Sequence, residues 1–416
     1  MRLKTSLTIT VFTALLATSV SHACVPGADT DTLPPPLQEI LAEGCESSAI
    51  YHTAGFLLRR EQPDAALPWL QALEARGWQL GLDAEVPEGT EALAVTKRLN
   101  ARVVPAPRAT PGRRLQAPSF FPEGIAADGA SGRLFLGSLT ENRVAVIPET
   151  GPATFWPLPA HDKLRAIYGI KYDADANQLW VLRNRTDVND VQDDAPAAEI
   201  LLLDGQTGAL VRSWPMPAGT PTELNDLCLT ATHAYVTDSR GARVLVLDRN
   251  RGSLTPLQIN RRLYYPNGIV CHRGGSLYVA DALGLMRIDT EAGASARLEA
   301  PEGQTLGGLD GLALHGDSII AVQNGIGLPR LIAIDISVSS TAITLLDSGN
   351  PTYDIPTTVA LMNGTAHVIA NSQMDMIDRF HDAPEETESL LSPVVILKLR
   401  LDDKQRAAGY EKPRSP

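Results

Sequence analysis

The sequence predicts an all-β fold, a six-bladed β-propeller preceded by a small α-helical domain. Three observations support this prediction: a motif that recurs six times, short apolar runs that follow each copy, and a composition rich in turn-forming residues. Thirty-three glycines and thirty prolines among 416 residues suit short strands joined by frequent turns. A hydrophobic content of 44% is enough for a packed core.

Residues 1–23 have the pattern of an export signal. Arg2 and Lys4 precede an apolar run, and the small residues Ser21 and Ala23 flank a cleavage position. We therefore expect a periplasmic or secreted protein. An alternative is a lipid anchor on Cys24, the first residue after cleavage. No later stretch is apolar for long enough to span a membrane, so no membrane span is expected.

Residues 24–112 are expected to form a helical N-terminal segment and a linker. Apolar residues recur at helical spacing from Ile50 to Leu58 and again from Ala66 to Leu73, where Pro63 suits the start of the second helix. A third helix is expected over Glu91 to Leu99. The Pro- and Arg-rich stretch from Val104 to Arg114 is typical of a linker. The helical segment is a candidate for contact with another protein.

Residues 113–402 carry the propeller repeats, and residues 403–416 form a polar tail. Six segments begin alike at intervals of 42 to 57 residues, and each continues into a turn and a second apolar run. This period is typical of propeller blades, which must stack in a ring because one blade cannot bury both of its faces. A strand near Leu115 is expected to close the ring. The first residues of the six segments are Glu123, Tyr168, Asn225, Asn267, Asp310 and Thr357.

The four cysteines are expected to include one disulfide, because an exported protein folds under oxidising conditions. Cys24 and Cys45 lie in the same small segment and form the expected pair. Cys228 and Cys271 follow their repeat starts by three and four residues, which predicts side chains on opposite faces of their strands. We therefore expect these two cysteines to be buried free thiols.

The repeat starts predict a metal site. The first strand of each blade lines the central channel, so its first residue lies at one mouth of that channel. Glu123 and Asp310 supply carboxylates there, and Asn225 and Asn267 supply amide oxygens. Calcium prefers such oxygen ligands, whereas zinc and copper favour softer ones. An alternative is that these residues only form turns, but turn formation does not explain Glu123 or the shared register.

The ordered set of motifs resembles the senescence marker protein/gluconolactonase family, which is related to paraoxonases and diisopropyl fluorophosphatase. The motifs are Phe-Pro-Glu123-Gly-Ile-Ala, Leu-Asn225-Asp-Leu, Pro-Asn267-Gly-Ile, Leu-Tyr-Val-Ala-Asp281 and Leu-Asp310-Gly-Leu, within residues 115–402. The resemblance implies a six-bladed propeller with a catalytic calcium that hydrolyses lactones, esters or phosphotriesters. It also implies that Asp310 is a base or nucleophile and that Asp226 orients the metal site.

Further candidate site residues follow from the same geometry. Tyr168 and Thr357 face the channel, and the ends of second strands return to the same mouth at Asn184, Asn324 and Asn371. These five are candidate substrate contacts, although the asparagines suit turn caps equally well. Paraoxonases have a histidine where this chain has Tyr168, and His161 is the histidine nearest to that position in sequence. His161 is therefore a second catalytic candidate, with a solvated surface residue as the alternative.

Two classes of function remain open. The first is a calcium-dependent hydrolase of a lactone or related ester acting on a small-molecule substrate. The second is a non-catalytic propeller that binds a ligand or protein and uses calcium as a structural ion. A strictosidine-synthase-like condensing enzyme is disfavoured, because relatives of that type lack the full metal set. The net charge of −12 argues against nucleic acid as a partner.

Overall fold

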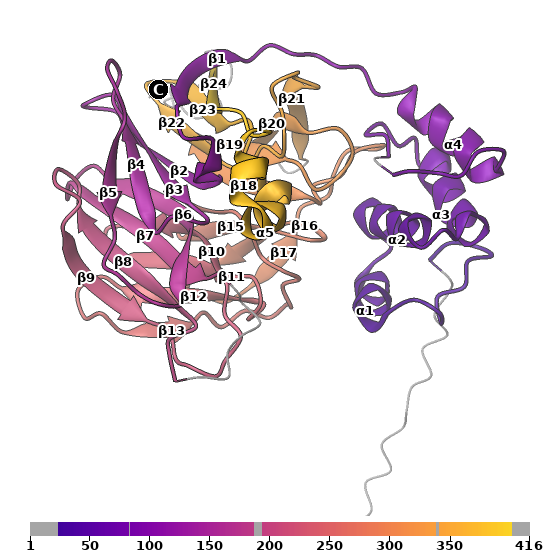
Figure 1. Cartoon of the computed structure of the whole chain (residues 1–416). Helices are drawn as coiled ribbons and strands as arrows, with labels where there is room; N and C mark the ends of the chain where they lie inside the picture. The colour runs from indigo at the N-terminus through magenta and orange to yellow at the C-terminus, as the bar shows by residue number, and fades with distance from the viewer. Residues whose placement is uncertain (1–23, 83, 187–193, 338–340, 402–416) are drawn as a thin grey trace, which may run out of the picture.

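The structure is a computed structural model that describes residues 24–82, 84–186, 194–337 and 341–401. The proposed export signal and the polar tail, residues 402–416, lie outside the described residues. Six four-stranded antiparallel sheets follow one another and form the blades of a propeller, which confirms the predicted fold class (Figure 1). No helix in the described ranges is long and apolar enough to cross a membrane.

Each blade from the first to the fifth is a contiguous meander. Blade 1 contains β2 (Pro122–Asp128), β3 (Arg133–Ser138), β4 (Arg143–Ile147) and β5 (Thr154–Pro157). Blade 2 contains β6 (Leu164–Asp173), β7 (Gln178–Arg185), β8 (Ala198–Asp204) and β9 (Leu210–Pro215). Blade 3 contains β10 (Leu224–Leu229), β11 (His233–Asp238), β12 (Arg243–Asp248) and β13 (Leu254–Pro256).

Blade 4 contains β14 (Ile269–His272), β15 (Ser276–Asp281), β16 (Gly284–Asp289) and β17 (Ser295–Arg297). Blade 5 contains β18 (Leu309–His315), β19 (Ser318–Gln323), β20 (Arg330–Asp335) and β21 (Ala342–Ser348). Blade 6 joins both ends of the propeller, because β1 (Thr110–Leu115) pairs with the last strand. Its other strands are β22 (Val359–Met362), β23 (Thr365–Ile369) and β24 (Val394–Arg400).

The ring is therefore closed by the strand β1, which pairs antiparallel with β24. The expected closing strand near Leu115 is present, but it begins at Thr110, inside the stretch that the sequence suggested to be a linker. The proline-rich composition of this stretch made the strand hard to predict. In the sheet, β24 lies between β1 and β23, so β1 is an outer strand. Pro111 has no N–H to donate, and an outer strand tolerates this missing donor.

The core is divided among the seams between neighbouring blades. Each pair of adjacent blades shares one buried apolar cluster, for example Phe135 and Ile167 between blades 1 and 2, or Val236 and Leu182 between blades 3 and 2. The same arrangement holds at the other four seams. Each blade thus packs one face against the preceding blade and the opposite face against the following one.

The helical segment contains α1 (Pro35–Glu43), α2 (Ser47–Arg59), α3 (Pro63–Ala75) and α4 (Glu91–Asn100). The last three occupy the stretches where the apolar spacing predicts helices, whereas α1 had no such periodic signal. Trp69, Leu70 and Leu99 are fully buried in its core. The Thr90 hydroxyl caps α4 by accepting a hydrogen bond from the Leu93 amide at 3.2 Å.

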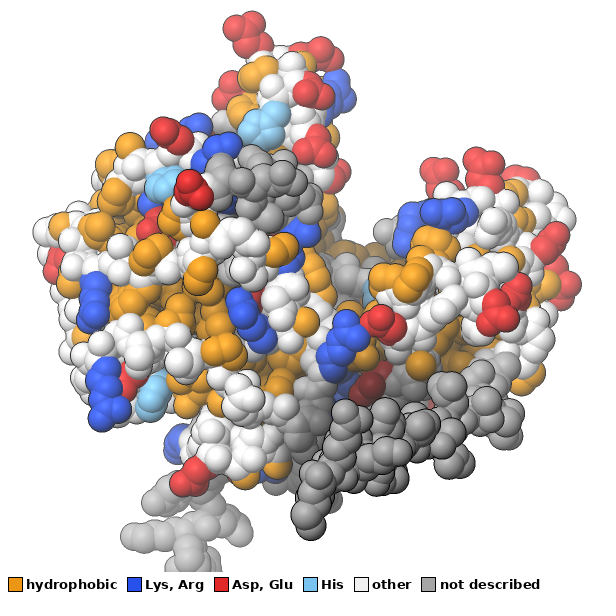
Figure 2. Space-filling view, turned by 90° about the horizontal axis from the view of Figure 1, so that it is seen from below, with side chains coloured by type: hydrophobic (Ala, Val, Ile, Leu, Met, Phe, Trp, Pro, Cys, Tyr) orange, Lys and Arg blue, Asp and Glu red, His pale blue; other side chains and the backbone are white. Residues whose placement is uncertain are grey.

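The helical segment packs onto blades 4 and 5 rather than standing apart. Leu283 and Ile326, from the β15–β16 and β19–β20 turns, insert into its apolar core. The Gly327 amide donates to the Tyr51 hydroxyl at 3.0 Å, and the Gln79 amide donates to the Gly303 carbonyl at 3.0 Å. These turns lie at the channel mouth where the first strands begin, because neighbouring strands are antiparallel. Figure 2 shows a hollow in the surface between the helical segment and the propeller.

Candidate metal centre

The same irregularity occurs at the start of the first strand in several blades. In β10, Leu224 pairs with Asp238 and Leu227 pairs with Val236, so two residues oppose one across the ladder. Matching register shifts occur in β2, β6 and β18. The bulged pairs begin with the residues that the repeats single out, Glu123, Tyr168, Asn225 and Asp310. A β-bulge reorients side chains and interrupts pairing, which suits a site at the channel mouth.

Glu123 and Asp310 lie close enough at the channel mouth for the charge of Asp310 to act on Glu123. Glu123 is buried, and its pKa is raised well above the usual range by burial and then by the negative charges of Asp310 and Asp226. Burial raises the pKa of Asp310 to about 7, although hydrogen bonds from Asn324 and Asn267 lower it. Asp310 keeps part of its surface exposed, so the site can be reached from solvent. Two carboxylates in this setting favour a bound cation.

The two amide side chains complete the oxygen donors. Asn225 is buried, and its Oδ1 atom has no hydrogen-bond partner among the described residues. The Glu123 Oε2 atom is in the same situation. Asn267 hydrogen-bonds to Asp310 and is only partly buried. Buried oxygen atoms without donors are costly, so this set fits a hard cation such as calcium.

No group of three or more His, Cys, Asp or Glu side chains within the described ranges is arranged to hold a metal ion. The candidate centre is not a cluster of this kind, because two of its four donors are asparagine amides. Its composition of two carboxylates and two amides has no soft ligand.

Asp226 lies directly behind these donors and links three strands. Its carboxylate accepts hydrogen bonds from the Leu227 amide at 2.8 Å and from the Ile269 amide at 3.2 Å. Lys171 lies 3.3 Å from the same carboxylate. Asp226 is therefore held between blades 2, 3 and 4.

Asn324 contacts the centre directly. Its amide nitrogen donates to Asp310 Oδ2 at 2.5 Å and to the Pro356 carbonyl at 2.7 Å. Tyr168 also faces the site, because the pKa of its hydroxyl is raised by burial and by the Glu223 and Glu123 carboxylates. Both side chains are partly exposed, so both can be reached by a ligand.

The other three candidate substrate contacts are buried and already bonded. The Thr357 hydroxyl donates to the Glu123 carbonyl at 2.9 Å, which joins blade 6 to blade 1. Asn184 exchanges hydrogen bonds with the Leu224 backbone at 2.8 and 2.9 Å. Asn371 bonds the Pro393 carbonyl and the Val395 amide. These side chains brace neighbouring strands, and the prediction that they contact substrate does not fit their burial.

His161 is held in a turn rather than at the donors. Its Nδ1 atom accepts hydrogen bonds from the Lys163 and Leu164 amides at 3.1 and 3.0 Å. Within the described residues, its ring makes no hydrogen bond or ion pair with Glu123 or Asp310. The imidazole thus acts as a cap for the segment that leads into β6.

The sequence interpretation missed a second polar group beside the centre. Glu223 is buried, accepts a hydrogen bond from the Tyr265 hydroxyl and lies 3.3 Å from Arg240. Its charge also raises the pKa of Glu123. Glu223 and Tyr265 each come two residues before a donor, Asn225 and Asn267. This position two residues before a donor is the sequence signal by which Glu223 and Tyr265 could have been found.

The insert after β23 approaches the same mouth. It contains a short 3-10 turn (Met374–Met376), α5 (Ile377–Asp382) and α6 (Pro384–Glu388). The ring of Phe380 in α5 packs edge-on against Phe121, with centroids 5.4 Å apart. Phe121 comes two residues before Glu123 and has a positive φ of 43°. A second insert, which follows β7 over residues 187–198, lies partly outside the described residues.

Comparison with solved structures supports the fold. The chain is similar to the major allergen Mala s 1 of Malassezia sympodialis, with 11% identity, a TM-score of 0.53, and coverage of 70% of this chain and 95% of that one. It is also similar to the calcium-binding protein regucalcin from Agrobacterium tumefaciens, with 17% identity, a TM-score of 0.47, and coverage of 71% and 94%.

A luciferin-regenerating enzyme shows 14% identity and a TM-score of 0.48 over 71% of this chain and 96% of its own. No protein-family model matches the sequence, and no curated protein matches it either. At these identities the similarity shows the fold alone. The chain is a β-propeller protein.

Proposed function

We propose that the protein is a calcium-dependent hydrolase of a lactone or related ester. The observation that carries this proposal is the pair of buried oxygen atoms without partners among the described residues, Glu123 Oε2 and Asn225 Oδ1, beside Asp310. Glu123, Asn225, Asn267 and Asp310 would hold the ion. When bound, calcium neutralises the two carboxylates and polarises a carbonyl oxygen of the substrate.

Asp310 is the candidate base or nucleophile. It is the carboxylate of the pair that solvent can reach, and Asn324 holds its Oδ2 atom in one orientation. Tyr168 and Asn324 are the candidate substrate contacts that remain accessible. Two disulfides and the absence of a membrane-spanning helix in the described ranges are compatible with a periplasmic or secreted location.

The first test is metal content. Purified protein should contain about one calcium per chain, and a chelator should lower its melting temperature, because an ion that binds only the folded state stabilises it. A protein that binds no calcium and melts identically with and without chelator would remove the basis of the proposal.

The second test is turnover by the calcium-loaded protein on a panel of lactones, aryl esters and phosphotriesters. Asp310→Asn should keep the fold and lose about 100-fold or more of the rate, the range expected for a general base. The matched control is Asp317→Asn in the turn at the opposite end of β18 and β19, where the carboxylate pairs with His272 at 2.9 Å. Calcium loading without turnover, together with tight ligand binding, would instead favour the non-catalytic propeller.

A further inference from the structure

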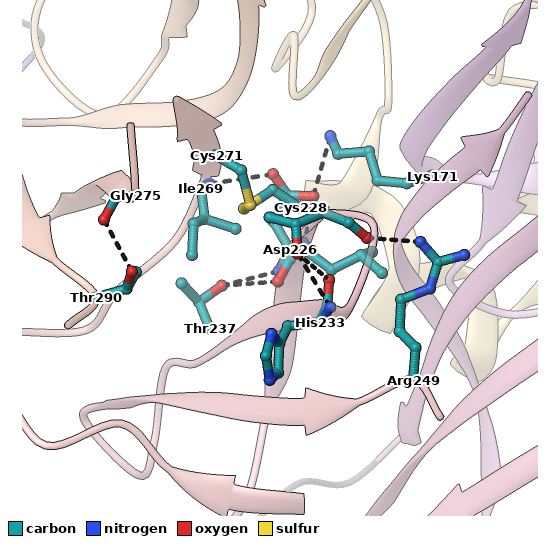
Figure 3. Close-up of a disulfide and its surroundings, with 12 residues drawn as sticks. Lys171, Asp226, Cys228, His233, Thr237, Arg249, Ile269, Cys271, Gly275 and Thr290 are labelled. Carbon is teal, nitrogen blue, oxygen red and sulfur yellow. Dashed lines mark hydrogen bonds and ion pairs between the residues drawn. A yellow bond between two sulfur atoms is a disulfide. The ribbon is translucent and has the colours of Figure 1, made fainter. Parts of the chain in front are cut away.

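A disulfide joins the two blades that carry the amide donors. Cys228 in β10 and Cys271 in β14 are bonded, with Cα atoms 5.6 Å apart (Figure 3). The prediction that they are free thiols was wrong. The two side chains do lie on opposite faces of their own blades, but adjacent blades pack front against back. Opposite faces are therefore the ones that meet at the seam between blades 3 and 4.

Four of the six seams are held closely by a glycine that directly follows the repeat start. A Cβ atom on Gly124 would collide with the Tyr168 carbonyl oxygen, and one on Gly169 would lie 2.5 Å from the Asn225 carbonyl oxygen. Gly268 and Gly311 are similarly pressed against blades 5 and 6. At each of these positions the absence of a side chain lets the backbones of neighbouring blades touch.

The seam between blades 3 and 4 cannot use this contact. The residue after its repeat start is Asp226, which has a side chain where four other seams have a glycine. Three other links replace the glycine contact: the Asp226 carboxylate accepts from the Ile269 amide, the disulfide joins the strands further along, and Thr237 bridges them. The Thr237 hydroxyl lies 3.2 Å from the Asp226 carbonyl oxygen (Figure 3). It also lies 2.6 Å from the Asn267 carbonyl oxygen.

This seam lies between Asn225 and Asn267. Amide oxygens carry no net charge and attract a cation less strongly than carboxylates do, so their contribution depends on being held in place beforehand. Asn225 begins the bulge three residues before Cys228, and Asn267 lies at the matching repeat start four residues before Cys271. The covalent bond therefore limits how far the two amide donors can move apart.

We propose that the Cys228–Cys271 disulfide, together with Thr237, is a positioning element of the metal centre that sets the spacing of Asn225 and Asn267. Formation of this disulfide is then a requirement for full calcium affinity, rather than only a source of stability. This inference rests on the proposed calcium site.

The test compares two double variants of the full chain. Cys228→Ser with Cys271→Ser should bind calcium about tenfold more weakly in isothermal titration calorimetry of chelator-treated protein, the lower end of the range for residues that orient metal ligands. The control, Cys24→Ser with Cys45→Ser, removes the other disulfide and should leave calcium affinity unchanged. Far-UV circular dichroism establishes that each variant is folded.

A second variant keeps the disulfide, in case the first double variant does not fold. Thr237→Val removes the hydroxyl that bridges the seam and should also weaken calcium binding about tenfold, whereas Thr237→Ser should restore it. A folded Cys228→Ser, Cys271→Ser protein with wild-type calcium affinity overturns the inference while the calcium site stands. The same holds if Thr237→Val leaves affinity unchanged. Wild-type protein that binds no calcium overturns the proposed function itself.

Discussion

At the scale of single residues, buried amides in this propeller have two different roles. Asn184 exchanges two hydrogen bonds with the Leu224 backbone, so its polar atoms are satisfied within the protein. Asn225, the residue after Leu224, leaves its Oδ1 atom without a donor in the part of the chain that the structure describes. The first amide stabilises the fold, whereas the role proposed for the second is to bind the calcium ion.

This contrast predicts opposite effects of two alanine substitutions. Asn184→Ala should lower the free energy of unfolding by about 1–3 kcal/mol, because it leaves buried backbone groups unpaired, and should leave calcium affinity unchanged. Asn225→Ala should weaken calcium binding with little loss of stability in chelator. Urea unfolding with and without calcium measures both. Equal destabilisation of the two variants in chelator would contradict the assigned roles.

The carboxylates predict a pH dependence for the calcium-free protein. Burial raises the pKa of Asp310 to about 7, whereas the pKa of an aspartate in an unfolded chain is about 4. Between these values the folded state binds more protons than the unfolded state, so stability should fall as pH rises from about 4 to about 7. Glu123, whose pKa is also raised, acts in the same direction.

Melting temperatures of chelator-treated protein across this pH range provide the measurement. Asp310→Asn should show a weaker pH dependence than the wild type, and saturating calcium should oppose the loss near neutral pH. A melting temperature that rises with pH over the window would show that these carboxylates do not control the stability of the calcium-free state.

At the scale of strands and turns, the repeat could be recognised in the sequence because the blades begin with similar short motifs. The motif identified the six first residues, four of which lie at bulges, and the antiparallel order identified the mouth to which second strands return. The side-chain contacts of Asn184, Asn371 and Thr357 were not predictable from that register alone. Each is decided by a partner in the neighbouring strand or blade, which a repeat alignment does not reveal.

The disulfide shows the same limit more sharply. Alternation along a strand correctly separates Cys228 and Cys271 onto different faces, but pairing depends on how two sheets stack. The strand β1 was also hidden, because Pro111 and the arginines near it resemble a linker. Local pattern thus predicted the elements and placed the candidate donors at the repeat starts, whereas contacts between blades required the three-dimensional structure.

The glycines at the bulges predict a packing cost. Gly169→Ala places a methyl group 2.5 Å from the Asn225 carbonyl oxygen. The two blades must separate to accept it, so the free energy of unfolding should fall by about 1–3 kcal/mol. Gly44→Ala is the control, because its nearest neighbour would lie 3.9 Å away. Chemical denaturation in chelator compares the two, and equal stability would argue against tight contact at this seam.

At the scale of the whole molecule, the helical segment and the propeller share one apolar cluster. Leu283 and Ile326 leave the propeller to pack among the helices, and the backbone of Gly327 lies against the Leu80 carbonyl oxygen. A side chain cannot fit at that position. The segment is therefore built onto the mouth of the propeller, and only its outer surface is available to the partner expected from sequence.

This docking predicts that Gly327→Val separates the two bodies. The substitution should expose the 104–109 connection to protease and divide thermal unfolding into two transitions. Gly219→Val is a matched control, because Gly219 also has a positive φ of 72°, but a Cβ atom added there would have no neighbour within 4 Å. If both variants resist protease equally and unfold in a single step, docking does not depend on this contact.

The pairing of β1 with β24 sets the order of events during biosynthesis. Five blades are built from consecutive stretches of chain, so all four strands of each are available as soon as that stretch has been made. The sixth needs Thr110–Leu115 to wait for Val394–Arg400, which is synthesised about 280 residues later. Until then the blades form an open arc, because β1 has no partner strand. Completion of the circle is therefore deferred until nearly all of the protein has emerged.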